Sequence, residues 1–438
     1  MVIASIDIQN GKVVQLRQGS ELMLQRENAL ELAEEFNRYG DVCIIDLDAA
    51  MGMGTNIGMI LPLLRKASCR IGGGIRTAER ARELISLGAQ KVIIGSVAFR
   101  DARKKGAGFA AGEFTVNIPL LESLVKKTGK NRLIIAVDAR RREGGGYEIL
   151  VDGWKTPTGL DLLEAARMVE PYTSELLFTC VDREGTMTGI DMEPIKQLRA
   201  AVSCSITVAG GVSTLEEIEI IAGLGCDVQL GMALYTGKLS LADAFVRSLN
   251  WKKGTPPDAP LLPLIAQSPD GQVLMTGFTD REALTETFAR GNLCFHSRSR
   301  NRLWMKGETS GNTLQLWSIR ADCDQDALLA VVDPQGPVCH TGKWTCFSQE
   351  RHYSWQLLQR IITDRFKNPS PGSYTATLDD ELVREKIQEE AEELCTAVNH
   401  GEILWEAADL LYFMTVLLTR AGLSVEEVLS ELDRRHKK

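Results

Sequence analysis

The feature that most restricts the fold is a regular alternation of short apolar runs and helix-like stretches. The apolar runs are the expected strands, and they occupy residues 2–6, 42–45, 67–71, 91–94, 132–137, 175–180, 205–208 and 228–230. Strand–helix units repeated in this way over about 250 residues match the size of a closed (β/α)₈ barrel. A doubly wound open sheet is the alternative. A glycine- and alanine-rich stretch at 104–112 lengthens the loop after the fourth expected strand.

A glycine turn occurs twice in this region, half a barrel apart. Residues 71–77 (IGGGIRT) resemble residues 208–214 (VAGGVST), and each copy leads to a later strand that ends in glycine. Phosphate favours such turns, because backbone N–H groups at a helix start surround the anion where no Cβ intervenes. The pattern predicts a substrate with a phosphate at each end. The candidate phosphate-binding glycines are Gly73, Gly74, Gly95, Gly210, Gly211 and Gly231.

Two aspartates follow the expected first and fifth strands. Asp7 and Asp138 would lie on opposite sides of the barrel mouth, where functional side chains gather in this fold. No histidine precedes His296, so proton transfer in this region falls to carboxylates, cysteines or lysines. The two aspartates are therefore a candidate general acid and base for the centre of the ligand.

A proline-rich segment at 252–263 (KKGTPPDAPLLP) separates the barrel from the rest of the chain. We expect the barrel at 1–249, the linker at 250–262 and a small α+β domain at 263–347, since residues 271–278 and 313–319 predict antiparallel strands. Between these strands, Arg298 and Arg300 alternate with serines. Guanidinium groups pair bidentately with phosphate, so this segment is a candidate phosphate grip.

The span from 322 to 346 combines ligands for a soft and a hard metal. Asp322, Asp324 and Asp326 alternate around Cys323, and Cys339, His340 and Cys346 follow. If residues 322–326 form a strand, its period of two places the three carboxylates on one face. Thiolates suit zinc and carboxylate oxygens suit magnesium, so the span predicts both ions. Buried structural cysteines beside a polar turn are the alternative.

The last ninety or so residues read as helices, at 353–366, 379–399, 402–421 and 424–435, and form the expected all-α domain at 348–438. Glu390 falls on the apolar stripe of the second helix, and the third helix is nearly all apolar. A carboxylate on a buried face is costly unless it is paired or binds a metal. The candidate magnesium ligands are Glu389, Glu390, Glu393, Glu406 and Asp409.

Charge and composition narrow the class of protein. The net charge of −8 disfavours a nucleic-acid groove, and no run reaches the length of a membrane span. Ten cysteines without the spacing of a disulfide framework favour a reducing, cytoplasmic location. We therefore expect partners other than nucleic acids or membranes.

The barrel motifs resemble one family. Residues 4–7 (ASID), 46–50 (DLDAA), both glycine turns, 152–154 (DGW) and 184–186 (EGT) are similar to the barrel isomerase of histidine biosynthesis. The resemblance implies an Amadori rearrangement of a bis-phosphorylated ribotide, with Asp7 as general base and Asp138 as general acid. A barrel of the cyclase type is an alternative. Glu184 and Cys43 depart from the family pattern. They motivate a second alternative, in which the barrel is a decayed scaffold without activity and only the other two activities survive.

The central motifs, Ser-Arg-Ser-Arg, Lys306-Gly307-Glu308, Asp-Cys-Asp-x-Asp and Cys-His-Thr-Gly, are similar to phosphoribosyl-AMP cyclohydrolase. The resemblance implies zinc on the three cysteines, magnesium on the three aspartates and a proton-handling role for His340. Zinc suits hydrolytic opening of a purine ring, because it lowers the pKa of bound water to about 7. In that family the zinc cysteines come from two subunits, which implies a homodimer.

The C-terminal motifs resemble phosphoribosyl-ATP pyrophosphohydrolase. They are residues 373–375 (SYT), 389–393 (EEAEE) and 406–412 (EAADLLY). The resemblance implies that the acids hold magnesium on a triphosphate, and a general nucleotide house-cleaning enzyme is the alternative. Together the three resemblances predict a trifunctional histidine-biosynthesis enzyme that acts on small phosphoribosyl nucleotides.

Overall fold

The computed structural model describes residues 1–101, 114–256 and 259–436. The chain divides into two compact units, the first formed by Met1–Ala266 with Thr276–Gly336 and the second by Gln267–Met275 with Pro337–Lys438. The long loop expected at 104–112 and residues 257–258 of the expected linker lie outside the described residues.

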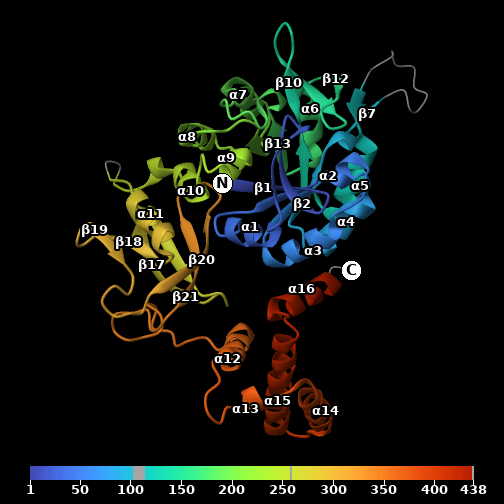
Figure 1. Cartoon of the computed structure of the whole chain (residues 1–438). Coiled ribbons are helices and arrows are strands. Elements are labelled where there is room, and N and C mark those ends of the chain that lie inside the picture. The colour runs from blue at the N-terminus through green and yellow to red at the C-terminus, as the bar shows by residue number, and fades with distance from the viewer. Residues whose placement is uncertain (102–113, 257–258, 437–438) are drawn as a thin grey trace. The chain divides into compact units, whose positions relative to one another are not determined.

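The first unit contains a closed parallel barrel, as the alternation of apolar runs predicts, so the open sheet is wrong. The last strand pairs with the first in parallel, with Val2 opposite Val228, which closes the sheet. Figure 1 shows the strands grouped around one axis. In order around the barrel they are β1 (Val2–Gln9), β4 (Val42–Asp46), β5 (Cys69–Gly72), β6 (Lys91–Ile94), β9 (Leu133–Ala136), β13 (Glu175–Thr179), β14 (Ser205–Ala209) and β15 (Asp227–Leu230).

Helices cover the outside of this barrel. Strands β5, β9 and β13 are buried along their whole length, as expected of parallel strands with packing on both faces. A small apolar cluster that includes Ile3, Cys43 and Ile134 is separate from the larger cluster beneath the helices. The covering helices are α1 (Ala29–Phe36), α3 (Ile57–Lys66), α4 (Ala78–Ser86), α5 (Ile118–Thr128), α6 (Leu162–Val169), α7 (Met192–Ala201), α8 (Leu215–Gly223) and α10 (Leu241–Ser248).

Short elements are inserted after several barrel strands. Strand β2 pairs antiparallel with β1 and then with β3, while β10, β11 and β12 form a sheet of their own. Strands β7 and β8 form a small hairpin. The inserted elements are β2 (Lys12–Arg17), β3 (Glu21–Arg26), α2 (Leu47–Met51), β7 (Phe99–Asp101), β8 (Phe114–Val116), β10 (Ala139–Arg141), β11 (Tyr147–Val151), β12 (Thr156–Asp161) and α9 (Met232–Tyr235).

A small α+β region follows the barrel, as the sequence predicts. It has a four-stranded sheet of order β17-β16-β21-β20 and a separate β18–β19 hairpin. Residues 322–326 form the turn between β20 and β21 and are not a strand, so the expectation that period two aligns the acids is wrong. The elements are β16 (Leu262–Gln267), β17 (Val273–Thr279), α11 (Arg281–Arg290), β18 (Cys294–Ser297), β19 (Arg302–Met305), β20 (Leu314–Ala321) and β21 (Leu328–Pro334).

The second unit is helical towards its C-terminal end. Its core includes Ile362, Leu378, Val383, Phe413 and Val416. The long helices α14 and α15 run side by side (Figure 1). The elements are α12 (Trp355–Lys367), α13 (Tyr374–Thr377), α14 (Asp380–Thr396), α15 (His400–Arg420) and α16 (Val425–His436).

Within the described residues, no single helix has enough length and apolar character to cross a bilayer. Helix α15 and the first part of α16 pass only as a joint pair, with a bend of 107° between them.

Candidate functional site

The carboxyl ends of the barrel strands surround a cavity of about 1790 Å³. Asp7 and Asp138 both line it, although they are 131 residues apart in the sequence. The same cavity is lined by all the glycines singled out above, namely Gly73, Gly74, Gly95, Gly210, Gly211 and Gly231. The structure thus brings the candidate acid–base and phosphate-binding residues of the barrel to one place.

The two glycine turns repeat in conformation as well as in sequence. Gly73 has φ +95° and Gly210 has φ +96°, and both values lie in the region that other residues rarely adopt. A Cβ on Gly73 would stand 2.1 Å from the Asp46 carbonyl oxygen, and one on Gly210 would stand 2.7 Å from the Cys180 carbonyl oxygen. Both glycines are therefore required by close packing of backbone on backbone, in addition to any ligand.

Each turn leads into a helix with the same type of cap. Thr77 accepts a hydrogen bond from the Arg80 N–H at the start of α4, and Thr214 accepts one from the Glu217 N–H at the start of α8. The Glu217 carboxylate also accepts from the backbone N–H groups of Ser213 and Ile190, each at 2.8 Å. Glu217 therefore fixes the second glycine turn against a neighbouring loop, a role that sequence spacing did not indicate.

A third carboxyl group, Glu184, lines the same cavity. Removal from water raises the pKa of Asp7 from 3.8 to about 6, with a smaller opposing effect of the hydrogen bond from Ser5. Removal from water, together with the charges of Asp7 and Asp138, raises the pKa of Glu184 to about 8. In the sequence, Glu184 is a departure from the pattern of the isomerase family. In the structure, it lines the cavity together with both aspartates.

Asp138 has hydrogen-bond donors that favour its ionised form. The Trp154 indole Nε1 donates to Asp138 Oδ2 at 2.9 Å, and the Thr179 side chain also forms a hydrogen bond with this carboxylate. Burial nevertheless raises the pKa of Asp138. Trp154 lies between β11 and β12 with φ +69°, and a Cβ on Gly19 would be only 3.0 Å from its ring. The Trp154 ring thus lies against the β2–β3 turn and reaches into the cavity.

The Ser-Arg-Ser-Arg segment forms the turn of the β18–β19 hairpin. The Arg298 guanidinium stacks 3.9 Å from the centre of the Phe278 ring, and Arg300 lies 5.5 Å from the Trp304 ring. Just before the turn, His296 Nδ1 lies 2.6 Å from an Asp280 carboxylate oxygen. Aromatic stacking restricts the two arginines but leaves their N–H edges able to bind an anion.

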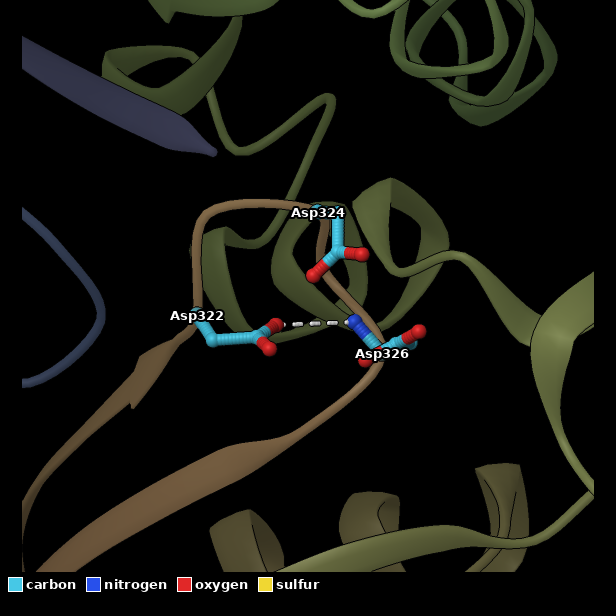
Figure 2. Close-up of side chains that lie close together, drawn as sticks. All are labelled: Asp322, Asp324 and Asp326. Carbon is cyan, nitrogen blue, oxygen red and sulfur yellow. Dashed lines mark hydrogen bonds between the residues drawn. The ribbon is translucent and has the colours of Figure 1, made fainter.

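The three aspartates of the β20–β21 turn converge, as Figure 2 shows. Carboxylate oxygens of Asp322, Asp324 and Asp326 all lie within 4.8 Å of one another. Asp322 Oδ1 accepts hydrogen bonds from the Asp326 N–H at 3.0 Å and the Ala327 N–H at 3.1 Å, and Gln325 takes φ +63° at the tip. The turn, and not a strand, brings the acids together. An all-oxygen set of this kind fits a hard divalent cation.

The candidate zinc ligands are divided between the two units. Cys323 belongs to the first unit, while Cys339 and Cys346 belong to the second, as does His340, the candidate proton-handling residue. Within the second unit, the Cys339 and Cys346 thiols share a hydrogen bond. The Thr341 hydroxyl, which donates to Cys339 Sγ at 3.1 Å, lowers the pKa of that thiol. The adjacent pair supplies two soft ligands from one loop, which fits zinc chemistry.

Helices α14 and α15 bring together three of the five candidate acids of the C-terminal domain. Oxygens of Glu390, Glu393 and Glu406 lie within 4.8 Å of one another, and Glu390 is 7% exposed. Burial and, after it, the charge of Asp409 raise the pKa of Glu390, which places Asp409 near the group. Glu389 forms an ion pair with Lys386 at 2.6 Å. Like charges held this close fit a cation between them.

Fold and sites together define a multi-domain enzyme with a (β/α)₈ barrel, whose cavity is lined by two glycine turns, and with two acidic groups that could hold a metal ion. Family models match in chain order. Residues 1–240 match "Histidine biosynthesis protein", 275–348 match "Phosphoribosyl-AMP cyclohydrolase" and 356–436 match "Phosphoribosyl-ATP pyrophosphohydrolase". The chain belongs to the histidine biosynthesis protein family. Its domains correspond to isomerase, cyclohydrolase and pyrophosphohydrolase activities of that biosynthesis, which confirms the resemblances seen in the sequence.

Curated relatives match less than half of the chain. The histidine biosynthesis bifunctional protein HisIE of Pyrococcus furiosus is 40% identical over 210 residues, which are 44% of this chain and 99% of that protein. The protein of the same name from Bacteroides thetaiotaomicron is 42% identical over 186 residues, or 40% of this chain and 92% of that protein. This chain therefore covers nearly the full length of these two relatives and is more than twice as long as the part that matches them.

Proposed function

We propose that the chain catalyses three consecutive reactions in the reverse of its domain order. The C-terminal helices hydrolyse phosphoribosyl-ATP to phosphoribosyl-AMP and pyrophosphate, and the central domain opens the purine ring. The barrel then isomerises the bis-phosphorylated ribotide. The observation that supports the last step best is the single cavity in which Asp7, Asp138 and the two glycine turns meet. An open cavity of this kind argues against a decayed barrel scaffold.

In the barrel, the glycine turns would hold the two terminal phosphates on backbone N–H groups, with the sugar centred between the acids. The Amadori rearrangement needs one proton delivered to the ribose ring oxygen as the ring opens, and another removed from C2 of that ribose, the carbon next to the anomeric carbon. We assign removal to Asp7 and delivery to Asp138. A base whose pKa is about 6 is ionised at neutral pH yet still a useful proton acceptor.

Glu184 is a second candidate for the acid. Its pKa of about 8 keeps it protonated at neutral pH. Burial also raises the pKa of Asp138, but the Thr179 and Trp154 hydrogen bonds oppose that rise, and Glu184 has no such opposing bond among the causes of its shift. Comparison of Glu184→Gln with Asp138→Asn separates the two assignments. The variant of the true acid should lose 10²- to 10⁴-fold in isomerase kcat. The variant of the other residue should lose far less.

In the central domain, Cys323, Cys339 and Cys346 would hold zinc, and Asp322, Asp324 and Asp326 would hold magnesium. Zinc, when bound, makes a water molecule nucleophilic at neutral pH. His340 would take up the proton released as water attacks the purine, and Arg298 and Arg300 would orient the substrate through its phosphate. The adjacent Cys339 and Cys346 thiols and the converging aspartates support these assignments.

In the C-terminal domain, Glu390, Glu393, Glu406 and Asp409 would hold magnesium on the triphosphate, with Glu389 nearby on the same helix. Bound magnesium supplies positive charge that offsets the charge of the phosphates. The hydroxyl groups of Thr375 and Tyr412, which lie 2.8 Å apart, join α13 to α15 and hold the Ser-Tyr-Thr motif beside this helix. A general house-cleaning enzyme that hydrolyses ordinary nucleoside triphosphates would have the same acids. The preference for phosphoribosyl-ATP over ordinary nucleoside triphosphates therefore decides between the two activities.

We further propose that the protein acts in the cytoplasm as a homodimer. Zinc ligands drawn from two subunits would require such a dimer. The first turns of α15 support the proposal, because Leu404 and Trp405 are 65% and 70% exposed in the single chain. Adjacent exposed apolar side chains can form a patch of the kind that marks protein–protein contacts.

The test uses the full chain with phosphoribosyl-ATP, magnesium and zinc. Pyrophosphate should appear first, then ring opening, then the isomerised ribotide. Glu390→Gln should stop the first step, and Glu392→Gln, an exposed neighbour on the same helix, should not. Asp7→Asn should stop only the last step. Pyrophosphate release without ring opening when zinc is present would contradict the central assignment.

A further inference from the structure

We infer that Lys253 is a built-in cation that occupies the turn of Asp322, Asp324 and Asp326 until a divalent metal displaces it. The inference rests on the proposed magnesium site in that turn. According to this inference, a residue of the segment that follows the barrel competes with the metal for the aspartates of the cyclohydrolase region.

The first observation is the position of the Lys253 ammonium group. It forms an ion pair with the Asp324 carboxylate and lies 3.4 Å from an Asp326 carboxylate oxygen. These two acids, together with Asp322, are the ones whose oxygens converge in Figure 2. The ammonium group therefore offsets negative charge at the converging carboxylates, although Lys253 itself lies outside the acidic turn.

The backbone on both sides holds Lys253 at this place. Lys253 ends a single helical turn, η6 (Trp251–Lys253), which follows α10 of the barrel. Trp251 is 5% exposed, and its Nε1 donates to the Val246 carbonyl oxygen at 2.8 Å. The Asn250 N–H donates to the Gln325 carbonyl oxygen, also at 2.8 Å, at the tip of the acidic turn. The contact is thus part of the packing between the barrel end and the turn.

Charge balance explains why a metal would displace the lysine. Three carboxylates within 4.8 Å repel one another, and one ammonium group offsets only one of their charges. A divalent cation offsets two and binds several oxygens directly. The Lys253 side chain is 44% exposed, so it has water beside it into which the ammonium can move.

The three aspartates would behave differently during the exchange. Asp322 closes the turn through its hydrogen bonds to the Asp326 and Ala327 N–H groups, and these bonds do not involve Lys253. Asp324 and Asp326 exchange the ammonium for the metal. The turn would therefore stay folded in both states, and the affinity for metal would depend partly on a residue of the segment that follows the barrel.

The experiment measures Mn²⁺ affinity by titration calorimetry and electron paramagnetic resonance, in full-length zinc-loaded protein. All proteins carry Glu390→Gln and Glu406→Gln, so that the acids of the C-terminal domain do not contribute. Lys253→Met is compared with Lys252→Met, a neighbouring exposed lysine that makes the same change in net charge. Lys253→Gln provides a second variant that keeps a polar side chain.

We expect Lys253→Met and Lys253→Gln to bind Mn²⁺ about two- to fivefold more tightly than Lys252→Met, the range for loss of competing exposed ion pairs. Equal or weaker binding would overturn the inference. Asp324→Asn, measured in parallel, should weaken binding strongly. If it does not, the proposed metal site itself is wrong. If Asp324→Asn weakens binding while the Lys253 variants match Lys252→Met, only the role of Lys253 is wrong.

Discussion

At the scale of single residues, the barrel cavity contains three carboxyl groups with different surroundings. Asp7 has one short-range partner, Ser5, while Asp138 has Trp154 and Thr179. Glu184 is influenced mainly by loss of water and by the charges of the two aspartates. Groups whose surroundings separate their pKa values in this way are suited to opposite roles in proton transfer.

The pH dependence of the isomerase step follows from Asp7. Its pKa of about 6 means that the base becomes ionised as pH rises through that value. We expect kcat/KM to rise about tenfold per pH unit below pH 6 and to level off above it. The measurement is isomerase kcat/KM from pH 4.5 to 8. A profile that is flat across pH 6 would contradict the assignment of Asp7 as base.

The same residue predicts a change in stability. The pKa of Asp7 in the folded chain, about 6, exceeds the ordinary value of 3.8, so the folded chain binds this proton more tightly than the unfolded chain. Ionised Asp7 therefore destabilises the barrel progressively as pH rises from about 4 to 6. Asp7→Asn should raise the urea midpoint of the barrel at pH 8. Near pH 4 the variant and the parent should unfold at similar urea concentrations, which provides the internal control.

At the scale of elements, the repeated turn and helix support the proposal that the barrel binds two phosphates in similar ways. The turns before α4 and α8 share glycine conformations and threonine caps. They differ in one respect, since the second copy adds the Glu217 capping box. Glu217 therefore holds the second turn in place through several backbone N–H groups.

Glu217→Ala tests this role. Loss of the bonds to Ser213, Thr214 and Ile190 should cost about 1–2 kcal/mol locally and speed hydrogen exchange at these amides. It should also raise the KM of the isomerase, because the turn that includes Gly211 becomes less ordered. Glu216→Ala, at the exposed neighbouring position, is the matched control. Unchanged exchange in Glu217→Ala would show that the turn is held by other contacts.

At the scale of the whole molecule, the proposed zinc site makes the ring-opening activity depend on formation of the homodimer. If the cysteines of one zinc come from two chains, dissociation of the dimer breaks the site. Dilution through the dimer dissociation constant should then release zinc and reduce ring-opening activity together. The isomerase of the barrel should persist, because its cavity is lined by residues of one chain. A zinc-sensitive dye and light scattering, followed over the same dilution series, check the prediction.

The barrel and its twofold repeat follow from the sequence alone, and so do the residue types proposed as metal ligands. Strand and helix periodicity is local, and the glycine, cysteine and aspartate motifs lie within short segments, so both are readable along the chain. The limits of that reading are also physical. Alternating aspartates suggest a strand, but the chain places them in a tight turn with Gln325 at positive φ.

Tertiary structure alone decided which distant residues meet. Glu184 lies beside Asp7, 177 positions earlier in the chain, only because the barrel closes. Lys253 reaches Asp324 and Asp326 because Trp251 packs into the barrel end and Asn250 bonds to the acidic turn. Such contacts depend on packing between elements far apart in the sequence. Spacing and residue type along the chain therefore predicted the candidate ligands. The residues that lie beside those ligands could be identified only from the folded structure.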